Sequence, residues 1–215
     1  AIQMFREQLH LKYNITIDVI STTELETIGG STTASRGTYL LGKALIDAVN
    51  KINKDLENAN IKDIVGKQYR GFYVCDWTTT PDFNGEMVSH FAYSFATHLV
   101  VLDKAGNIKK VIGAHDSGKV VNKKLFEGQI QGGIVMGLGY AMTEKLVLKD
   151  GVPVNNSLGK LGLLRSTDVP IDIEVFTVET EDVDAPYGAK GVGEISSIPT
   201  AAAVGGAFRQ YYGQH

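Results

Sequence analysis

The sequence predicts an α+β fold in which mixed and antiparallel strands pack with helices. Apolar residues recur at helical spacing in some segments and alternate in others, as in half-buried strands. These two kinds of segment are mixed along the chain without the regular rhythm of a doubly wound parallel sheet. The 215 residues, 43% of them hydrophobic and 21% charged, are enough to bury a core in one or two domains.

The first segment predicts a helix and then a strand. Ile2, Phe5 and Leu9 share one face of an amphipathic helix, and residues 14–22 alternate as a half-buried strand should. The polar loop at residues 22–35 follows and is a candidate site. Because the chain opens without an initiator Met and already inside the amphipathic pattern, we expect it to be a piece of a longer chain.

The next helix is predicted at residues 36–53, where apolar side chains recur at helical spacing and Ser35 can serve as the N-cap. The charged stretch at residues 50–63 is expected to end this unit. We therefore expect a helix–strand–helix unit at residues 1–60 and place residues 61–215 in the remainder of the fold.

An antiparallel meander is predicted after this unit. Residues 69–77, 90–103 and 107–116 have the composition of strands, and a turn falls at residues 104–107. Residues 122–144 predict a helix that holds several glycines. Since each glycine costs about 0.5 to 1 kcal/mol in a helix interior, close backbone packing or a neighbouring ligand is expected to offset the loss.

The last third of the chain predicts two more strands and a final helix. Residues 146–151 and 171–179 carry the strand pattern. Pro199 can occupy the first turn of a helix that continues through residues 200–212, because the proline nitrogen lacks a proton that this turn does not need.

Composition and charge exclude several classes of function. A formal charge of −3 and an isoelectric point near 6.0 leave no basic stripe for nucleic acid. The only cysteine is Cys75, so disulfides, cysteine-ligated iron-sulfur clusters and the usual structural zinc sites are not expected. No apolar run approaches the roughly 18 residues of a membrane span, and no signal peptide is visible. We expect a cytoplasmic protein that binds neither nucleic acid nor membrane.

The histidines show no HExxH motif or other recognised metal spacing. They are His10, His90, His98, His115 and His215.

Residues 113–120, GAHDSGKV, match the GxxxxGK part of a phosphate-binding loop between a predicted strand and helix. Val120 stands where such a loop needs Ser or Thr to hold magnesium. The alternative is an ordinary turn in which Asp116 bonds local amides, and we favour it over a nucleotide triphosphatase.

Glu194 lies among glycines in residues 188–199, GAKGVGEISSIP, just before the last predicted helix. It can be a carboxylate favoured by the positive end of the helix dipole. It can also be a general base on backbone that approaches a ligand closely.

Five stretches, in order, resemble the molybdenum-binding subunit of the xanthine dehydrogenase and aldehyde oxidase family of molybdenum hydroxylases. Residues 162–179 and 189–200 are most similar to bacterial purine hydroxylases of the xanthine and hypoxanthine dehydrogenase type. The five stretches are residues 29–44, 90–103, 115–122, 128–144 and 188–204.

The resemblance implies a C-terminal molybdopterin-binding domain and a molybdenum-pterin cofactor, expected in the cytosine dinucleotide form. Glu194 of the GVGE motif would be the general base that removes a proton from the water-derived oxygen, with Gly191 and Gly193 allowing close approach. Backbone amides of the loop that ends in Thr33, Ala34 and Ser35 would lie against the cofactor. Gln129 would contact it as well, and no side chain is expected to bind the metal directly.

Two further residues bear on the substrate. Phe91 stands where the family packs an aromatic ring on a heteroaromatic substrate, although a Phe in an alternating strand is more often a core residue. Ala92 replaces a hydroxyl residue of the animal enzymes, which leaves the purine undefined.

We therefore expect part of a molybdenum-dependent hydroxylase that oxidises hypoxanthine, xanthine or a related N-heterocycle with water as the oxygen source. The N-terminal part of the subunit would complete the site, and iron-sulfur clusters and FAD would lie on other domains or subunits. The chain alone is expected to be inactive and can lack the cofactor. The alternatives are an aldehyde oxidoreductase and a non-catalytic assembly module of the same fold.

Overall fold

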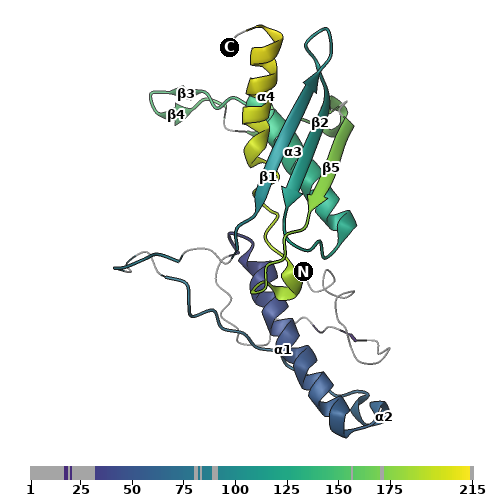
Figure 1. Ribbon diagram of the computed structural model, residues 1–215. Coiled ribbons are helices and arrows are strands. Elements are labelled where there is room, and N and C mark those ends of the chain that lie inside the picture. Colours follow the sequence, from purple (N-terminus) through teal and green to yellow (C-terminus); the bar gives the residue numbers. More distant parts are fainter. Residues whose placement is uncertain are drawn as a thin grey trace. The chain divides into compact units, whose positions relative to one another are not determined.

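The computed structural model describes residues 17–18, 20, 32–79, 82, 84–88, 92–155, 157–169 and 172–213. Helices and a mixed sheet are both present, so the predicted α+β class is confirmed (Figure 1). The chain divides into two compact units. Unit 1 takes residues 1–93 and 181–191, and unit 2 takes residues 94–180 and 192–215. The predicted helix at the start of the chain and most of the strand over 14–22 fall outside the described residues.

Unit 1 is built on helix α1 (Arg36–Asn58), which is followed by the single turn of α2 (Ile61–Ile64). Helix α1 ends within the charged stretch at residues 50–63, five residues past the predicted bound at residue 53. Its apolar stripe continues through Ile52 and Leu56, which form a small core with Ile64. Burial of that stripe offsets the charged residues between its members.

The strand predicted at residues 69–77 was wrong, because the segment forms no strand and belongs to no sheet. It contacts α1 instead. The backbone N–H of Phe72 donates to Asp47 Oδ2 at 2.9 Å, and Lys51 donates to the carbonyl of Arg70 at 2.9 Å. A Cβ on Gly71 would lie 1.8 Å from the carbonyl oxygen of Ala44, so the chain passes the helix too closely for any side chain there.

The second part of unit 1 comes from far along the sequence. The short 3-10 helix η4 (Pro186–Gly188) packs on α1. Beside it, the Tyr39 hydroxyl donates to the carbonyl of Asp184 at 3.0 Å. Residues 181–191 are thereby joined to the first turns of α1.

Unit 2 contains a three-stranded sheet in the order β1-β2-β5. Strands β1 (Phe95–Leu102) and β2 (Ile108–Asp116) form the predicted antiparallel hairpin. Its turn is closed by Asp103, whose Oδ1 accepts from the amides of Ala105 and Asn107. The third strand, β5 (Asp172–Val178), pairs with β2 in parallel, so the sheet is mixed and not a simple meander.

Helices α3 (Lys123–Met142) and α4 (Ile198–Tyr211) contact the sheet and each other (Figure 1). Asn122 caps α3, because its side-chain oxygen accepts from the amide of Leu125 at 3.0 Å. Pro199 occupies the first turn of α4 as predicted. The core between sheet and helices consists of Val100, Ile108, Val111, Phe126, Ile130, Ile134, Leu138 and Val204.

After α3 the chain forms a small hairpin and two 3-10 turns before it enters β5. The hairpin pairs β3 (Leu148–Lys149) with β4 (Val152–Pro153). The turns are η2 (Leu158–Lys160) and η3 (Ser166–Asp168).

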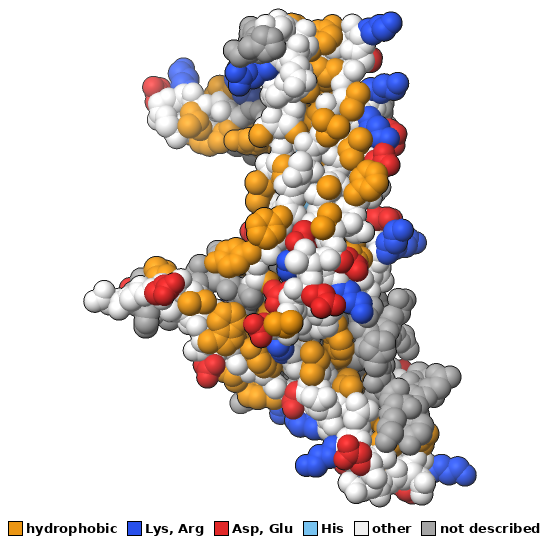
Figure 2. Space-filling model, in the orientation of Figure 1, with side chains coloured by type: hydrophobic (Ala, Val, Ile, Leu, Met, Phe, Trp, Pro, Cys, Tyr) orange, Lys and Arg blue, Asp and Glu red, His pale blue; other side chains and the backbone are white. Residues whose placement is uncertain are grey.

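The opposite face of the sheet carries exposed apolar side chains, and Figure 2 shows hydrophobic surface over the strands. Phe95 and Leu99 of β1 are 65% and 57% exposed, and Phe176 and Val178 of β5 are 50% and 49% exposed. We call these four residues the open apolar face. Within the described ranges, no helix has the length and apolar character needed to cross a bilayer.

Candidate functional site

In unit 1, the predicted cofactor loop is a tight turn that leads into α1. Ala34 and Ser35 have φ angles of 47° and 56°, in the left-handed region. The amide of Arg36 donates to the carbonyl of Thr33 at 2.9 Å and closes the turn. Ser35 is the N-cap residue, as predicted, but its side chain makes no capping hydrogen bond. Two adjacent non-glycine residues in this region cost on the order of 1 to 3 kcal/mol each, and such backbone is typical of ligand-binding turns.

Gly191 packs directly against this turn. A Cβ at Gly191 would lie 2.7 Å from both Cβ and Oγ of Ser35, so only glycine fits without a shift. Both residues line a small cavity of about 10 Å³. Ala92 also lines this cavity. One of the two predicted substrate residues therefore lies next to the predicted cofactor loop. The other, Phe91, falls outside the described residues. The full lining is Ala34, Ser35, Thr38, Tyr39, Ala92, Ala189, Lys190 and Gly191.

In unit 2, Glu194 lies on the turn at residues 193–197 and its side chain is exposed. Its backbone is held, since the carbonyl of Glu194 accepts from the amide of Ser197 at 3.1 Å and from that of Ile198 at 3.4 Å. Helix α4 begins at Ile198, four residues after Glu194. The helix-dipole interpretation of this carboxylate is weakened, because that effect falls off beyond the first turn.

Gln129 lies beside the same turn. Its Nε2 atom in α3 donates to the carbonyl of Gly193 at 3.4 Å, and the hydroxyl of Ser196 donates to the same oxygen at 2.8 Å. The structure thus brings together three of the predicted residues, Gln129, Gly193 and Glu194. The carbonyl on the N-terminal side of Glu194 is fixed by one helix side chain and by one side chain of the turn itself.

Glycines in α3 permit this close approach, which confirms the predicted close packing. A Cβ at Gly133 would lie 2.0 Å from Ser196 Oγ, and one at Gly137 would lie 2.5 Å from Thr200 Cβ. Ser196 and Thr200 are both fully buried. The turn that carries Glu194 and the start of α4 therefore rest on the glycine face of α3.

A polar cluster that the sequence did not single out lies inside unit 2. His98 of β1 and His115 of β2 are buried, and their Nε2 atoms are 2.9 Å apart. His98 Nδ1 lies 3.0 Å from Thr200 Oγ1. Burial and the neighbouring imidazole lower the pKa of His98 to about 4, and burial lowers the pKa of His115. The available signal was their position in the strands, where each takes a core-facing place among apolar residues.

The GAHDSGKV segment forms a local turn, as we favoured. Asp116 Oδ1 accepts from the amides of Gly118 at 3.0 Å and Thr180 at 3.4 Å. The amide of Val120 donates to Glu179 Oε1 at 2.9 Å. Carboxylates hold these amides, so the segment is not arranged to receive a phosphate group.

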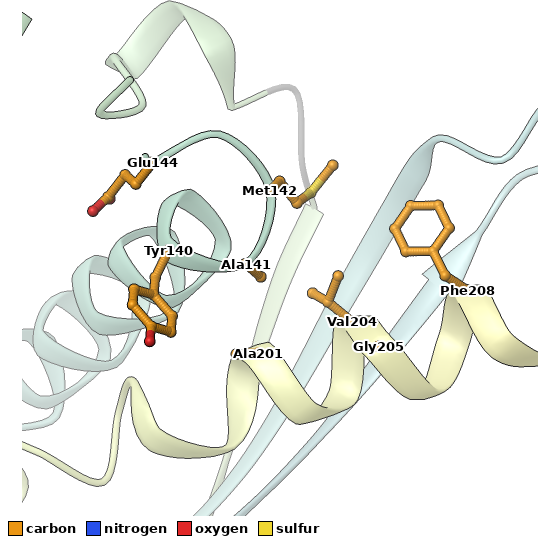
Figure 3. Close-up of a pocket in the computed structure, with 8 residues that line it drawn as sticks. All are labelled: Tyr140, Ala141, Met142, Glu144, Ala201, Val204, Gly205 and Phe208. Carbon is orange, nitrogen blue, oxygen red and sulfur yellow. The ribbon is translucent and has the colours of Figure 1, made fainter. Parts of the chain in front are cut away.

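A further cavity lies away from these residues, between the end of α3 and helix α4 (Figure 3). It has a volume of about 720 Å³, and Tyr140, Met142, Glu144 and Phe208 are among its lining residues. Tyr140 and Met142 are 74% and 50% exposed. Among the described residues, no group of three or more His, Cys, Asp or Glu side chains is placed to hold a metal ion.

Residues 59–170, more than half of the chain, match the family described as molybdopterin cofactor-binding domain. The chain belongs to this family, and the resemblance to molybdenum-binding subunits is confirmed.

Two curated relatives are similar to part of this chain, and one solved structure shares its fold. The xanthine dehydrogenase molybdenum-binding subunit of Escherichia coli is 36% identical over 108 residues, which are 49% of this chain and 14% of that protein. The aldehyde oxidoreductase molybdenum-binding subunit PaoC of Escherichia coli is 29% identical over 121 residues, 53% of this chain and 16% of that protein. The Cu,Mo-CO dehydrogenase shares the fold, with a TM-score of 0.51 at 22% identity over 60% of this chain and 17% of that chain. The chain thus spans less than a fifth of the length of these relatives.

Proposed function

We propose that the chain supplies one part of the catalytic centre of a molybdenum-dependent hydroxylase, with Glu194 as the general base. The observation that carries the proposal is the Glu194 turn, in a chain of the molybdopterin cofactor-binding family. The carboxylate is exposed while the carbonyls of Gly193 and Glu194 are both hydrogen-bonded. A reactive side chain on fixed backbone is the arrangement that general-base catalysis requires.

The residues present fit an anionic pterin cofactor in two places. In unit 1, the left-handed turn at Ala34 and Ser35 leads into the N-terminus of the 23-residue helix α1, where backbone amides favour negative charge. The cavity of about 10 Å³ beside it has room for a water-sized group, so this turn would contact one edge of the cofactor. In unit 2, the amide group of Gln129 would contribute a hydrogen bond. The cytosine dinucleotide form of the cofactor is part of the proposal.

When bound, this cofactor supplies two-electron redox chemistry at molybdenum. The chain's own contribution is positional and acid–base. Glu194 would take the proton of the water-derived oxygen that adds to an electron-poor ring carbon of the substrate, and would keep that proton on its carboxylate. Gln129 and Ser196 hold the Gly193 carbonyl and thereby restrict where the carboxylate can point.

We propose hypoxanthine, xanthine or a related N-heterocycle as the substrate. The relative named xanthine dehydrogenase is 36% identical, against 29% for the relative named aldehyde oxidoreductase. Ala92 lies beside the cofactor turn, and Phe91 precedes it in the sequence. An aromatic residue next to a small residue in the sequence suits a flat heterocycle better than a flexible aldehyde. Aldehyde oxidation remains the competing activity, and the two are separated by the rates with purines and aldehydes.

The proposed partners follow from the size of the chain and its cysteine content. The preceding part of the molybdenum subunit would complete the cofactor cleft. Electrons would leave to iron-sulfur clusters and FAD on other domains or subunits, because the chain has one cysteine and a cluster needs several. A cytoplasmic location is part of the same proposal.

The test is Glu194→Gln in the complete enzyme, with Glu181→Gln as the matched control on another exposed Glu. Rapid mixing with xanthine or hypoxanthine measures the reductive half-reaction. We expect the Glu194 variant to keep its cofactor content and its rate of reoxidation, and to reduce 10² to 10⁴-fold more slowly, since general-base catalysis typically supplies that factor. The Glu181 variant should reduce at the normal rate.

A near-normal reduction rate in the Glu194→Gln enzyme would remove Glu194 from the chemistry. It would then favour the competing interpretation, a non-catalytic assembly module that keeps the fold. Metal analysis of the purified complex separates the two as well, because an assembly module need not retain molybdenum.

A further inference from the structure

The first turn of helix α4 is hydrogen-bonded to the turn that carries Glu194. The carbonyl of Glu194 accepts from the amide of Ser197 at 3.1 Å, and the carbonyl of Ser197 accepts from the amide of Thr200 at 3.3 Å. These consecutive bonds make residues 194–200 one continuous folded segment that ends inside α4. A shift of Thr200 is therefore passed along the backbone to Glu194.

Thr200 is held on two sides. On one side it packs against α3, because a Cβ at Gly137 would lie 2.5 Å from Thr200 Cβ and 3.0 Å from the carbonyl oxygen of Ser197. On the other side, Thr200 Oγ1 lies 3.0 Å from Nδ1 of His98 in β1. Thr200 is fully buried, so bulk water does not compete for this hydrogen bond. The start of α4 is thus held between α3 and the sheet.

The His98 ring is fixed in turn by the neighbouring strand. Its Nε2 atom lies 2.9 Å from Nε2 of His115 in β2, and one proton between the two nitrogens makes this contact a hydrogen bond. Gly113 packs against both rings, since a Cβ there would lie 2.7 Å from His115 Cε1 and 3.3 Å from His98 Cδ2. The imidazole that faces Thr200 therefore cannot rotate without breaking a second buried hydrogen bond.

The turn is also bonded to α3, but more weakly. Gln129 Nε2 donates to the carbonyl of Gly193 at 3.4 Å, and the Gln129 side chain is exposed. A long hydrogen bond that is open to water contributes less than a shorter one that is buried. Of these two links between residues 193–200 and the rest of unit 2, the bond between Thr200 and His98 is the stronger.

We propose that Thr200 and His98 are positioning residues, whose hydrogen bond anchors the start of α4 to β1 and thereby fixes where the Glu194 turn lies. Both side chains are buried, so they act through the backbone and not on the substrate. The role of His115 is to hold the His98 ring in the orientation that faces Thr200. The catalytic consequence rests on the proposed role of Glu194, whereas the structural consequence does not.

Three substitutions in the complete enzyme isolate this hydrogen bond. Thr200→Val keeps the shape of the side chain and removes the hydroxyl, whereas Thr200→Ser keeps the hydroxyl. His98→Gln removes the partner, because the amide of Gln reaches the Nε2 position and can still bond His115. It decides the question if Thr200→Val does not assemble. Thr143→Val is the matched control, since it removes a hydroxyl that donates to the carbonyl of Gly162 at 2.7 Å, at the other end of α3.

The first measurement is hydrogen–deuterium exchange of the peptide that spans residues 192–198. We expect exchange on the order of 10-fold faster in Thr200→Val and in His98→Gln, because loss of a buried hydrogen bond shifts the local opening equilibrium by this amount. Thr200→Ser and Thr143→Val should match the wild type. The double variant Thr200→Val with His98→Gln should exchange no faster than either single variant, since both remove one bond. Wild-type exchange in Thr200→Val, or additive effects in the double variant, would overturn the proposal.

The second measurement is steady-state kinetics per bound molybdenum. We expect kcat to fall about 10 to 100-fold in Thr200→Val with KM little changed, since a small misplacement of a catalytic group costs rate more than binding. Thr200→Ser should recover most of that rate. If Glu194→Gln is inactive and Thr200→Val has a normal kcat, the positioning role is refuted. If Glu194→Gln is active, the proposed function fails and the exchange data alone decide whether Thr200 and His98 hold the turn.

Discussion

Gly191 and Ser35 provide a residue-scale test of how tightly the cofactor turn is packed. The added methyl of Gly191→Ala would lie 2.7 Å from Ser35 Cβ, and Gly191 does not have a positive φ that would add backbone strain. Overpacking of this kind costs about 1 to 3 kcal/mol. We expect the free energy of unfolding of unit 1 to fall by that amount, as followed by the fluorescence of Trp77, the only tryptophan.

The partner substitution shows whether the clash is the cause. Ser35→Gly removes the atoms that the new methyl would meet, and glycine accepts the φ of 56° without cost. It loses no capping hydrogen bond, because the Ser35 side chain makes none. The double variant should therefore recover most of the lost stability. If Gly191→Ala is just as destabilising on the Ser35→Gly background, the two residues do not touch in solution.

At the residue scale, the sequence named candidate site residues but did not reveal the buried histidine pair. Glu194, Gln129 and Ser35 could be named from motifs, because each belongs to a stretch that resembles a known family. His98 and His115 could not, because the two residues are 17 positions apart in the sequence and are brought together only by the pairing of β1 with β2. A search of the sequence for metal-ligand spacing does not find such a pair. The two imidazoles are far apart in the sequence and hydrogen-bond to each other.

The glycines of α3 give the element-scale prediction, with a matched pair of adjacent positions. A Cβ at Gly133 would lie 2.0 Å from Ser196 Oγ and 2.8 Å from backbone of the Glu194 turn, whereas a Cβ at Gly132 meets nothing within 4 Å. We expect Gly132→Ala to raise the free energy of unfolding by about 0.5 to 1 kcal/mol through helix propensity. Gly133→Ala should lower it by about 1 to 3 kcal/mol, because backbone has to move.

Urea unfolding followed by far-ultraviolet circular dichroism measures both variants of the pair. The Gly133 variant should also speed hydrogen exchange at residues 193–197, and the Gly132 variant should leave it unchanged. Similar effects of the two substitutions would show that α3 does not approach the turn as closely as the structure has it.

Elements were predicted well where local pattern and tertiary packing agree. The hairpin of β1 and β2 and the proline in α4 both follow from local signals. The segment at 69–77 has strand composition, but its polar groups are met by Asp47 and Lys51 of α1. Composition alone cannot show that a helix will supply these partners. The same applies to α1, whose last turn is fixed by contacts with Ile64.

At the scale of the whole molecule, the pairing of distant segments was beyond prediction. Strand β5 joins β2 in parallel although more than 50 residues separate them, and residues 181–191 return to pack on α1. The periodicity of each segment is the same whichever neighbour it takes. The predicted boundary at residue 60, between a helix–strand–helix unit and the remainder of the fold, remains a prediction.

The open apolar face of the sheet leads to the last prediction. Four apolar side chains on the two outer strands of the sheet are each about half exposed or more, and an exposed apolar patch on a soluble domain marks an interaction site. We expect the 215-residue chain by itself to associate through this face. Sedimentation velocity should show an s-value that rises with concentration, and Leu99→Lys with Phe176→Lys should abolish the rise. Val183→Lys is the control, because Val183 is 90% exposed and lies in unit 1, outside this face.

In the complete enzyme, the preceding part of the molybdenum subunit is the expected cover, given that the relatives are more than five times longer than the matched region. The same double lysine variant should then lower the yield of assembled complex, since burying two charges without partners costs several kcal/mol. Val183→Lys should assemble normally. Normal assembly of the double variant would mean that the face stays exposed to water in the enzyme, and self-association of the isolated chain would then have to be explained by a different surface.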